Sequence, residues 1–162
     1  MLSRTFKPAL SLRRFARNER GTQLVELAIV LPVVLILLGA SAEFGRFFYT
    51  YQTLSKATRT GARYLMTESA AGISDAKAKN LVVYGNPSGT GTPVLSGLSG
   101  ANVRVVRTGG SSAFPARVTV RIEGYVYQPV FDLGKLIGKP TFSLRVPVSP
   151  STTMRYFSSI PS

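Results

Sequence analysis

The sequence ERGTQLVELAIVLPVVLILLGASAEFGR, which runs from Glu19 to Arg46, contains the only strongly apolar stretch of the chain. Between Leu24 and Ala42 the one charged residue is Glu26. A helix over these residues is about 28 Å long, which is close to the hydrocarbon thickness of a bilayer. The stretch therefore predicts a membrane-spanning helix, and Pro32 inside it is expected either to kink the helix or to free the carbonyl one turn earlier.

The charges that precede this stretch indicate its orientation. Residues 1–21 contain six Lys and Arg residues and a single acid, a net charge of +5. A cationic block directly before an apolar run stays in the cytoplasm by the positive-inside rule. We expect residues 1–21 to be a cytoplasmic leader, residues 22–43 to be the transmembrane helix, and everything after them to lie outside.

Beyond Glu43 the sequence becomes amphipathic without a helix-breaking residue, so the helix is expected to continue over residues 44–66. Apolar side chains recur there at helical spacing, and basic ones fall elsewhere on the helical wheel. Aromatic residues gather at the start of this continuation and fit either a membrane interface or a packed core. They are Phe44, Phe47, Phe48, Tyr49 and Tyr51.

The remaining residues, 67–162, predict a small α+β head. Ser74 is suited to cap a short helix that leads toward Tyr84. Residues 85–100 are rich in Gly, Pro, Ser and Thr, which is typical of a flexible loop. Period-two alternation then predicts three antiparallel strands that pack on the long helix. The expected strands are 102–108, 117–127 and 142–148.

The composition argues against an enzyme. The chain has 162 residues and a net charge of +13, with no His and no Cys. The usual general base, the thiolate nucleophile and the commonest metal ligands are therefore missing. We expect no catalytic residue, no metal site and no cofactor.

The basic residues of the head allow a different role. The predicted strands place four arginines on the polar face of the sheet, where they could contact an anionic polymer. An ordinary solvated sheet face would show the same pattern. No recognition helix or base-stacking motif accompanies it, which argues against nucleic acid as the partner. The four residues are Arg104, Arg117, Arg121 and Arg145.

Three fates of the apolar segment are compatible with the residues alone. It could remain as an uncut anchor. It could be a secretory signal that is cut after Ala42, because Ala40-Ser41-Ala42 satisfies the small-x-small rule. Alternatively, it could be cut on the cytoplasmic side, after Gly21.

Several motifs resemble the TadE-like minor pilins of tight-adherence (Tad, or Flp) pilus systems. A basic leader ends in Gly21, and Glu26 is the fifth residue after it, as in type IV prepilins. Leu31-Pro32, Glu43-Phe44-Gly45-Arg46 and Thr58-Arg59-Thr60-Gly61-Ala62-Arg63-Tyr64 match further landmarks of the family. Val83-Tyr84-Gly85-Asn86-Pro87 and Met154-Arg155-Tyr156 resemble its later ones. Leu27 departs from the family, in which Phe or Tyr often follows the Glu.

This resemblance implies a type IV pilin-like protein in the bacterial inner membrane. A prepilin peptidase would cut after Gly21, and the new α-amine on Thr22 would pair with Glu26 of a neighbouring subunit. Other pilins and the pilus assembly platform would be its partners, in support of surface adhesion. The alternative for Glu26 is a passive position among the headgroups near Arg20. The alternative function is an exported or membrane-anchored binding domain with a basic sheet.

Overall fold

The computed structural model describes residues 19–67, 74–110, 115–136 and 138–155. Within these residues the contacts divide the chain into two units, residues 1–42 and 43–162. The first unit, in its described part, is helix only. The second unit contains the sheet and the hydrophobic core, and it is called the head below.

Helix α2 (Glu19–Thr67) begins in the first unit and ends in the head. It is continuous through Pro32, so the single long helix predicted over residues 22–66 is confirmed. In the first unit, the apolar side chains of α2 are exposed in the isolated chain, and Leu24 and Ile29 are each 67% exposed. By length and composition this helix could cross a membrane, and it is the one such helix in the described parts of the chain.

Helix α3 (Asp75–Tyr84) has well-defined ends. The hydroxyl of Ser74 accepts a hydrogen bond from the Lys77 amide at 3.4 Å, which confirms the predicted N-cap. Gly85 closes the helix in the left-handed conformation, at φ 74°, and its N–H donates to the Leu81 carbonyl. The loop predicted over residues 85–100 is irregular as expected, and only its last residue enters the short 3₁₀ helix η1 (Gly100–Asn102).

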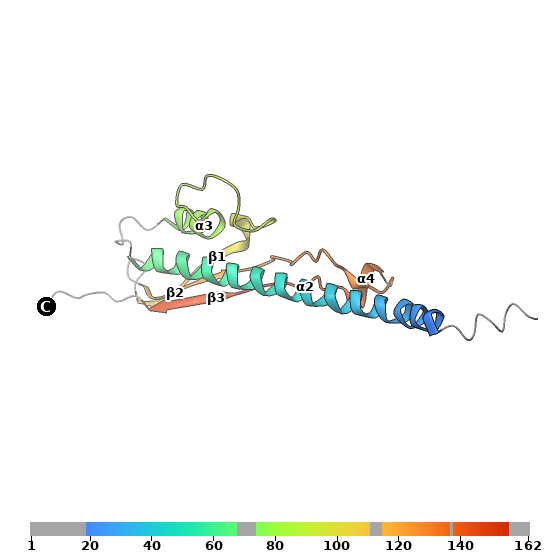
Figure 1. Ribbon diagram of the computed structural model, residues 1–162. Coiled ribbons are helices and arrows are strands. Elements are labelled where there is room, and N and C mark those ends of the chain that lie inside the picture. Colours follow the sequence, from blue (N-terminus) through green and yellow to red (C-terminus); the bar gives the residue numbers. More distant parts are fainter. Residues whose placement is uncertain (1–18, 68–73, 111–114, 137, 156–162) are drawn as a thin grey trace, which may run out of the picture. The chain divides into compact units, whose positions relative to one another are not determined.

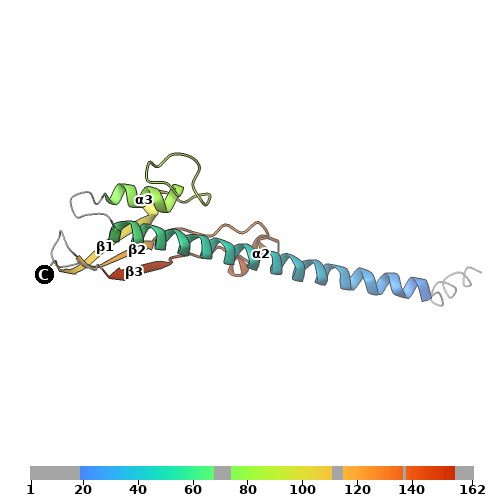
Figure 2. The same ribbon diagram turned by 60° about the vertical axis from the view of Figure 1, so that its left-hand side comes forward.

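Three antiparallel strands form one sheet in the order β1-β2-β3. They are β1 (Val103–Gly110), β2 (Pro115–Ile122) and β3 (Ser151–Arg155). Val105 lies opposite Val120, and Val118 lies opposite Met154. Figures 1 and 2 show the sheet along the C-terminal part of α2, with α3 nearer to β1 than to β3. The predicted α+β class is confirmed.

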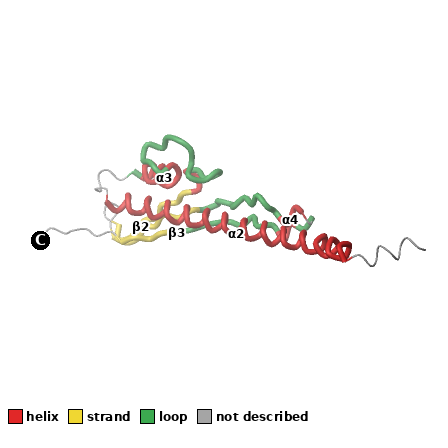
Figure 3. Tube along the Cα trace, viewed as in Figure 1, coloured by secondary structure: helices red, strands yellow, loops and turns green. Residues whose placement is uncertain are grey.

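The prediction for the third strand was wrong. Residues 142–148 form no strand. Phe142 is the last residue of the 3₁₀ helix η2 (Pro140–Phe142), and the residues after it are irregular, apart from one isolated bridge between Pro147 and Val126. Pro147 is at a non-hydrogen-bonded position of this bridge, between the bond from the Tyr127 amide to the Val146 carbonyl and the bond from the Val148 amide to the Tyr125 carbonyl, and the pairing extends no further. The second strand also ends at Ile122, earlier than predicted. Between β2 and β3 the chain is mostly loop, apart from η2 and the short helix α4 (Leu133–Leu136) (Figure 3).

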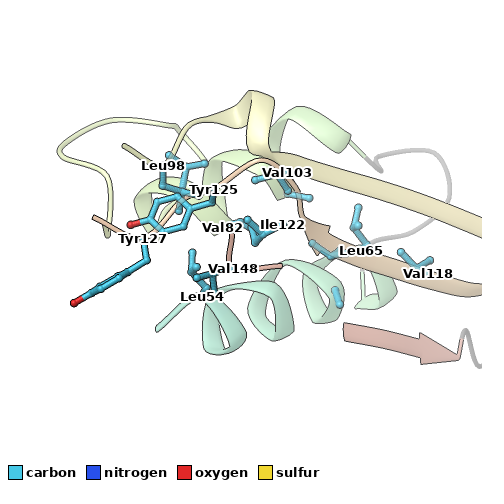
Figure 4. Close-up of a cluster of buried hydrophobic side chains, with 14 residues drawn as sticks. Leu54, Leu65, Val82, Leu98, Val103, Val118, Ile122, Tyr125, Tyr127 and Val148 are labelled. Atoms are coloured by element: carbon cyan, nitrogen blue, oxygen red, sulfur yellow. The ribbon is translucent and has the colours of Figure 1, made fainter. Parts of the chain in front are cut away.

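The core of the head is assembled from one face of each element. Leu54, Ala62 and Leu65 of α2 are fully buried, as are Val82 and Val83 of α3. Ala78 of α3, the sheet, and loop residues before and after β2 complete the cluster (Figure 4), with Leu98, Val103, Val118, Val120, Ile122, Tyr125, Tyr127 and Val148. Burial of this apolar surface is the main stabilising contribution.

Candidate functional site

The residues predicted to act in processing and assembly lie together at the start of α2. Gly21, Thr22 and Glu26 are helical, and Thr22 and Glu26 are exposed. Residues four apart on a helix lie on one face, separated by a rise of about 6 Å. The α-amine that a cut after Gly21 would create on Thr22 is therefore on the same helix face as the Glu26 carboxylate.

Glu26 is the one acidic residue among the described residues 20–42. Neighbouring side chains such as Leu24, Val25 and Leu27 are more than half exposed. In the isolated chain this carboxylate therefore lies on an apolar helix surface. In hydrocarbon such a group requires a positive partner, because an unpaired charge there is costly.

A second carboxylate, Glu43, has an unexpected environment. Its side chain is only 2% exposed, because residues of the head cover it rather than lipid. The Tyr127 hydroxyl donates to Oε1 at 2.5 Å, the Val130 amide donates to Oε1 at 3.1 Å, and the Phe131 amide donates to Oε2 at 3.0 Å. Glu43 thus binds the loop of residues 127–131 to α2.

These contacts determine the ionisation of the pair. Burial by itself raises the pKa of Glu43, but the hydrogen bonds from Tyr127, Phe131 and Val130 and the charge of Arg46 outweigh it. The pKa of Glu43 therefore lies below its ordinary value. Burial and the neighbouring carboxylate raise the pKa of Tyr127 to about 12. The site contains a buried carboxylate and a neutral phenol at physiological pH.

Sequence reasoning assigned no role to Glu43 beyond its place in a motif. The other residues of that motif are exposed: Phe44 is 55% exposed, and a side-chain carbon at Gly45 would meet nothing within 4 Å. Phe47, one turn after Glu43, packs edge-to-face on Tyr127 with the ring centroids 5.4 Å apart. The sequence contained a signal for this role of Glu43. A carboxylate directly after an apolar run must either reach water or accept hydrogen bonds from protein donors.

The motif Thr58–Tyr64 forms a close contact between α2 and α3. Gly61 faces Val82, and a Cβ atom at Gly61 would lie 2.5 Å from the Val82 Cγ2 atom. Thr58 is fully buried, and its hydroxyl lies 3.0 Å from that of Thr152 on β3. The small residues of this motif therefore allow α2 to approach both α3 and β3 closely.

The predicted arginine stripe is partly correct. Arg104, Arg117 and Arg121 lie on exposed positions of β1 and β2, and Arg104 is opposite Arg121. Arg145 does not belong to the sheet, because its segment is irregular, and its guanidinium donates to the Gln128 side chain at 2.6 and 3.0 Å. Arg155 on β3 takes its place opposite Arg117. It was not predicted, because β3 was not.

A groove of the head lies between α2 and β3. It has a volume of about 630 Å³ and is lined by polar and basic side chains, including Lys56, Arg59 and Thr152. No group of three or more His, Cys, Asp or Glu residues that could hold a metal occurs among the described residues. The groove contains no acid or nucleophile and base arranged for catalysis.

Comparison with known families finds a match for part of α2. Residues 21–63 match the family model described as TadE-like protein. This segment is TadE-like. The match begins at Gly21 and includes Glu26, Pro32, Glu43 and Gly61, so the resemblance seen in the sequence is confirmed over those residues.

The TadE-like family is one of pilus components and is not a known enzyme family. A long apolar N-terminal helix, such as α2, is consistent with a pilin-like protein. No curated protein and no solved structure matches the chain. The family match ends at residue 63 and does not include the sheet of the head.

Proposed function

We propose that the chain is a minor pilin or pseudopilin of a tight-adherence pilus, which supports filament assembly through its N-terminal helix. One observation carries the proposal: the TadE-like match starts at Gly21, the residue before the proposed cut, and includes Glu26. Other pilins and the assembly platform are the proposed partners. In this role the protein is a substrate of processing and does not act as a catalyst.

The proposed location is the bacterial inner membrane, with a single pass. Residues 24–42 supply the apolar length, and the basic residues before them favour a cytoplasmic N-terminus. The buried environment of Glu43 supports an end of the span before that residue, because its ligands come from the head. The head would then lie on the periplasmic or extracellular side.

The proposed processing step is cleavage of the Gly21–Thr22 bond by a prepilin peptidase. In the described part of the chain this bond lies within α2. Glycine lowers helix stability by about 1 kcal/mol relative to alanine. This favours the local opening that a peptidase requires.

Cleavage would create the partner that Glu26 needs. The new α-amine of Thr22 is largely cationic near neutral pH. In hydrocarbon a neighbouring subunit that places its Thr22 amine beside Glu26 removes the cost of an unpaired carboxylate. Only one axial stagger of two parallel helices achieves this, so the charge pair would select the register of assembly.

Substitution of Glu26 tests this proposal. Glu26→Ala is expected to leave leader removal unchanged and to lower the number of assembled pili at least about tenfold, which corresponds to about 1.4 kcal/mol. Glu26→Asp retains the charge and should restore part of the assembly. Gln23→Ala, which changes a nearby polar residue without altering the charge, is the matched control. Normal pili in the Glu26→Ala strain would show that the charge pair does not act.

A further inference from the structure

The solvent-facing side of the sheet is strongly basic. It is called the outer sheet face here and consists of the residues that alternate with the buried ones along each strand. They are Arg104, Val106, Thr108, Arg117, Thr119, Arg121, Ser151, Thr153 and Arg155. All of them are exposed except Thr119, which is half-buried. This face carries four arginines and no acid of its own.

The four arginines form two cross-strand pairs with different surroundings. Arg104 lies opposite Arg121, and both bind the carboxylate of Glu123, at 3.2 and 2.6 Å. Arg117 lies opposite Arg155. No carboxylate of the described residues forms an ion pair with either of these two. The sheet therefore contains one arginine pair whose charge is partly offset by a shared carboxylate and one open arginine pair.

The geometry of the open pair makes this contrast more pronounced. The Ile122 amide donates to the Pro150 carbonyl, so these two residues are a hydrogen-bonded pair. From there, non-hydrogen-bonded and hydrogen-bonded pairs alternate along β2 and β3. Arg117 and Arg155 consequently form a non-hydrogen-bonded pair, the type in which side chains lie closer together. Like charges directly opposite on one face destabilise a sheet. An anion between the two guanidinium groups would reverse that repulsion.

The surroundings of the open pair indicate the kind of anion. Hydroxyl groups of Thr108, Thr119 and Thr153 lie in the same or the adjacent row of the sheet. Those of Thr119 and Thr153 hydrogen-bond to each other at 2.8 Å, which leaves one of these two hydroxyl hydrogens and the acceptor lone pairs for hydroxyl-rich ligands. The planar fork of arginine binds carboxylates in a bidentate manner. The outer sheet face has no aromatic side chain on which nucleic-acid bases could stack. These features together favour an acidic sugar polymer over a nucleic acid.

We propose that Arg117 and Arg155 form a binding site for the carboxylate groups of an acidic polysaccharide. The guanidinium groups would bind one uronate carboxylate between them, and the threonine hydroxyls beside them would bind the sugar hydroxyls. The Arg104–Arg121 pair contributes less, because the carboxylate of Glu123 offsets part of its positive charge. This role concerns the head alone and does not depend on how the N-terminal helix is processed.

Binding of alginate, a polymer of uronic acids, tests the site on the full chain in detergent micelles. The test variant is Arg117→Thr with Arg155→Thr, and the matched control is Arg104→Thr with Arg121→Thr. Both remove two positive charges and retain a residue that favours strands. The test variant is expected to lose at least about tenfold in affinity, and the control less than about threefold. Thermal unfolding verifies that both variants are folded.

Glu123→Gln provides an independent gain-of-binding test. Removal of this carboxylate should free Arg104 and Arg121 and raise alginate affinity, and this gain should vanish in the Arg104→Thr/Arg121→Thr background. Neutral dextran should not bind. Equal losses in the two double variants would overturn the proposal, because binding would then follow net charge alone. Tighter binding of a short DNA duplex than of alginate, with the same dependence on Arg117 and Arg155, would overturn it in favour of nucleic acid.

Discussion

Glu43 connects the long helix to the loop that precedes α4. Two of the donors to its carboxylate are backbone amides, those of Val130 and Phe131, and the third is the Tyr127 hydroxyl. Backbone amides cannot change their role as donors, so the site requires an acceptor with two free oxygens. A buried carboxylate with such donors is stable as an anion, and a side chain without two acceptor oxygens would leave at least one of these part-buried hydrogen bonds unmade.

Glu43→Gln is predicted to lower the free energy of unfolding of the head by about 1–3 kcal/mol. The amide NH₂ group would face a backbone N–H of Val130 or Phe131, which leaves one donor without an acceptor. Tyr127→Phe removes a single hydrogen bond and should cost only about 1 kcal/mol. Chemical unfolding of the full chain in micelles measures both values. Equal stability of Glu43→Gln and the wild type would contradict this account of the site.

The same pair predicts how stability depends on pH. The folded pKa of Glu43 is lowered from 4.5, so its contribution is present above that value and is lost as the pH falls through the folded pKa. Tyr127 has a folded pKa raised from 10.0 to about 12. Its contribution is present below pH 10 and is lost as the pH rises toward 12, by at most about 3 kcal/mol.

Unfolding experiments across pH, with variants as references, check these limits. Relative to the wild type, Glu43→Gln should flatten the decline of stability below pH 4.5, and Tyr127→Phe should flatten the decline above pH 10. Other titrating groups contribute equally to each pair of curves and cancel in the difference. Parallel curves for the wild type and a variant would exclude that residue as a source of the pH dependence.

At the scale of elements, the packing of α2 on α3 depends on one glycine. Val82 is fully buried and β-branched, so its methyl group cannot rotate away from a new Cβ atom at Gly61. Gly61→Ala is predicted to cost about 1–3 kcal/mol through overpacking. Gly45→Ala, in the same helix but with no atom within 4 Å of the new carbon, should instead stabilise by about 0.5–1 kcal/mol.

Thermal unfolding of the two alanine variants provides the measurement. Gly61→Ala combined with Val82→Ala should be less destabilised than the sum of the single variants, because the second change removes the clashing methyl group. A Gly61→Ala variant as stable as Gly45→Ala would show that the two helices can separate slightly without cost.

The sequence predicted the elements that have a strong local pattern and missed the one that does not. The long helix has a continuous apolar and amphipathic pattern, and α3 has a serine cap and a glycine end, so both were predicted. β3 was missed because Ser151-Thr152-Thr153-Met154-Arg155 is mostly polar. Of its two inward side chains only Met154 packs against the core, and Thr152 meets Thr58. Residues 142–148 alternate like a strand, but Val148 reaches the core from an irregular segment.

For the molecule as a whole, motif and structure provide different parts of the account. Gly21, Glu26 and the motif around Glu43 are recognisable in the sequence, and the family match includes all of them. The groups that donate to the Glu43 carboxylate lie more than 80 positions away in the sequence. Which arginines face one another depends on the register of the strands. Such long-range pairing cannot be derived from local periodicity.

The central claim is that a cut after Gly21 exposes the Thr22 amine for assembly. Intact-mass measurement and N-terminal sequencing of the chain recovered from cell envelopes test it most directly. The account predicts a mature chain that begins at Thr22, and an uncut chain when Gly21 is replaced by a bulkier residue. A chain that still carries residues 1–21, or one that begins at Glu43 after cleavage behind Ala42, would contradict it.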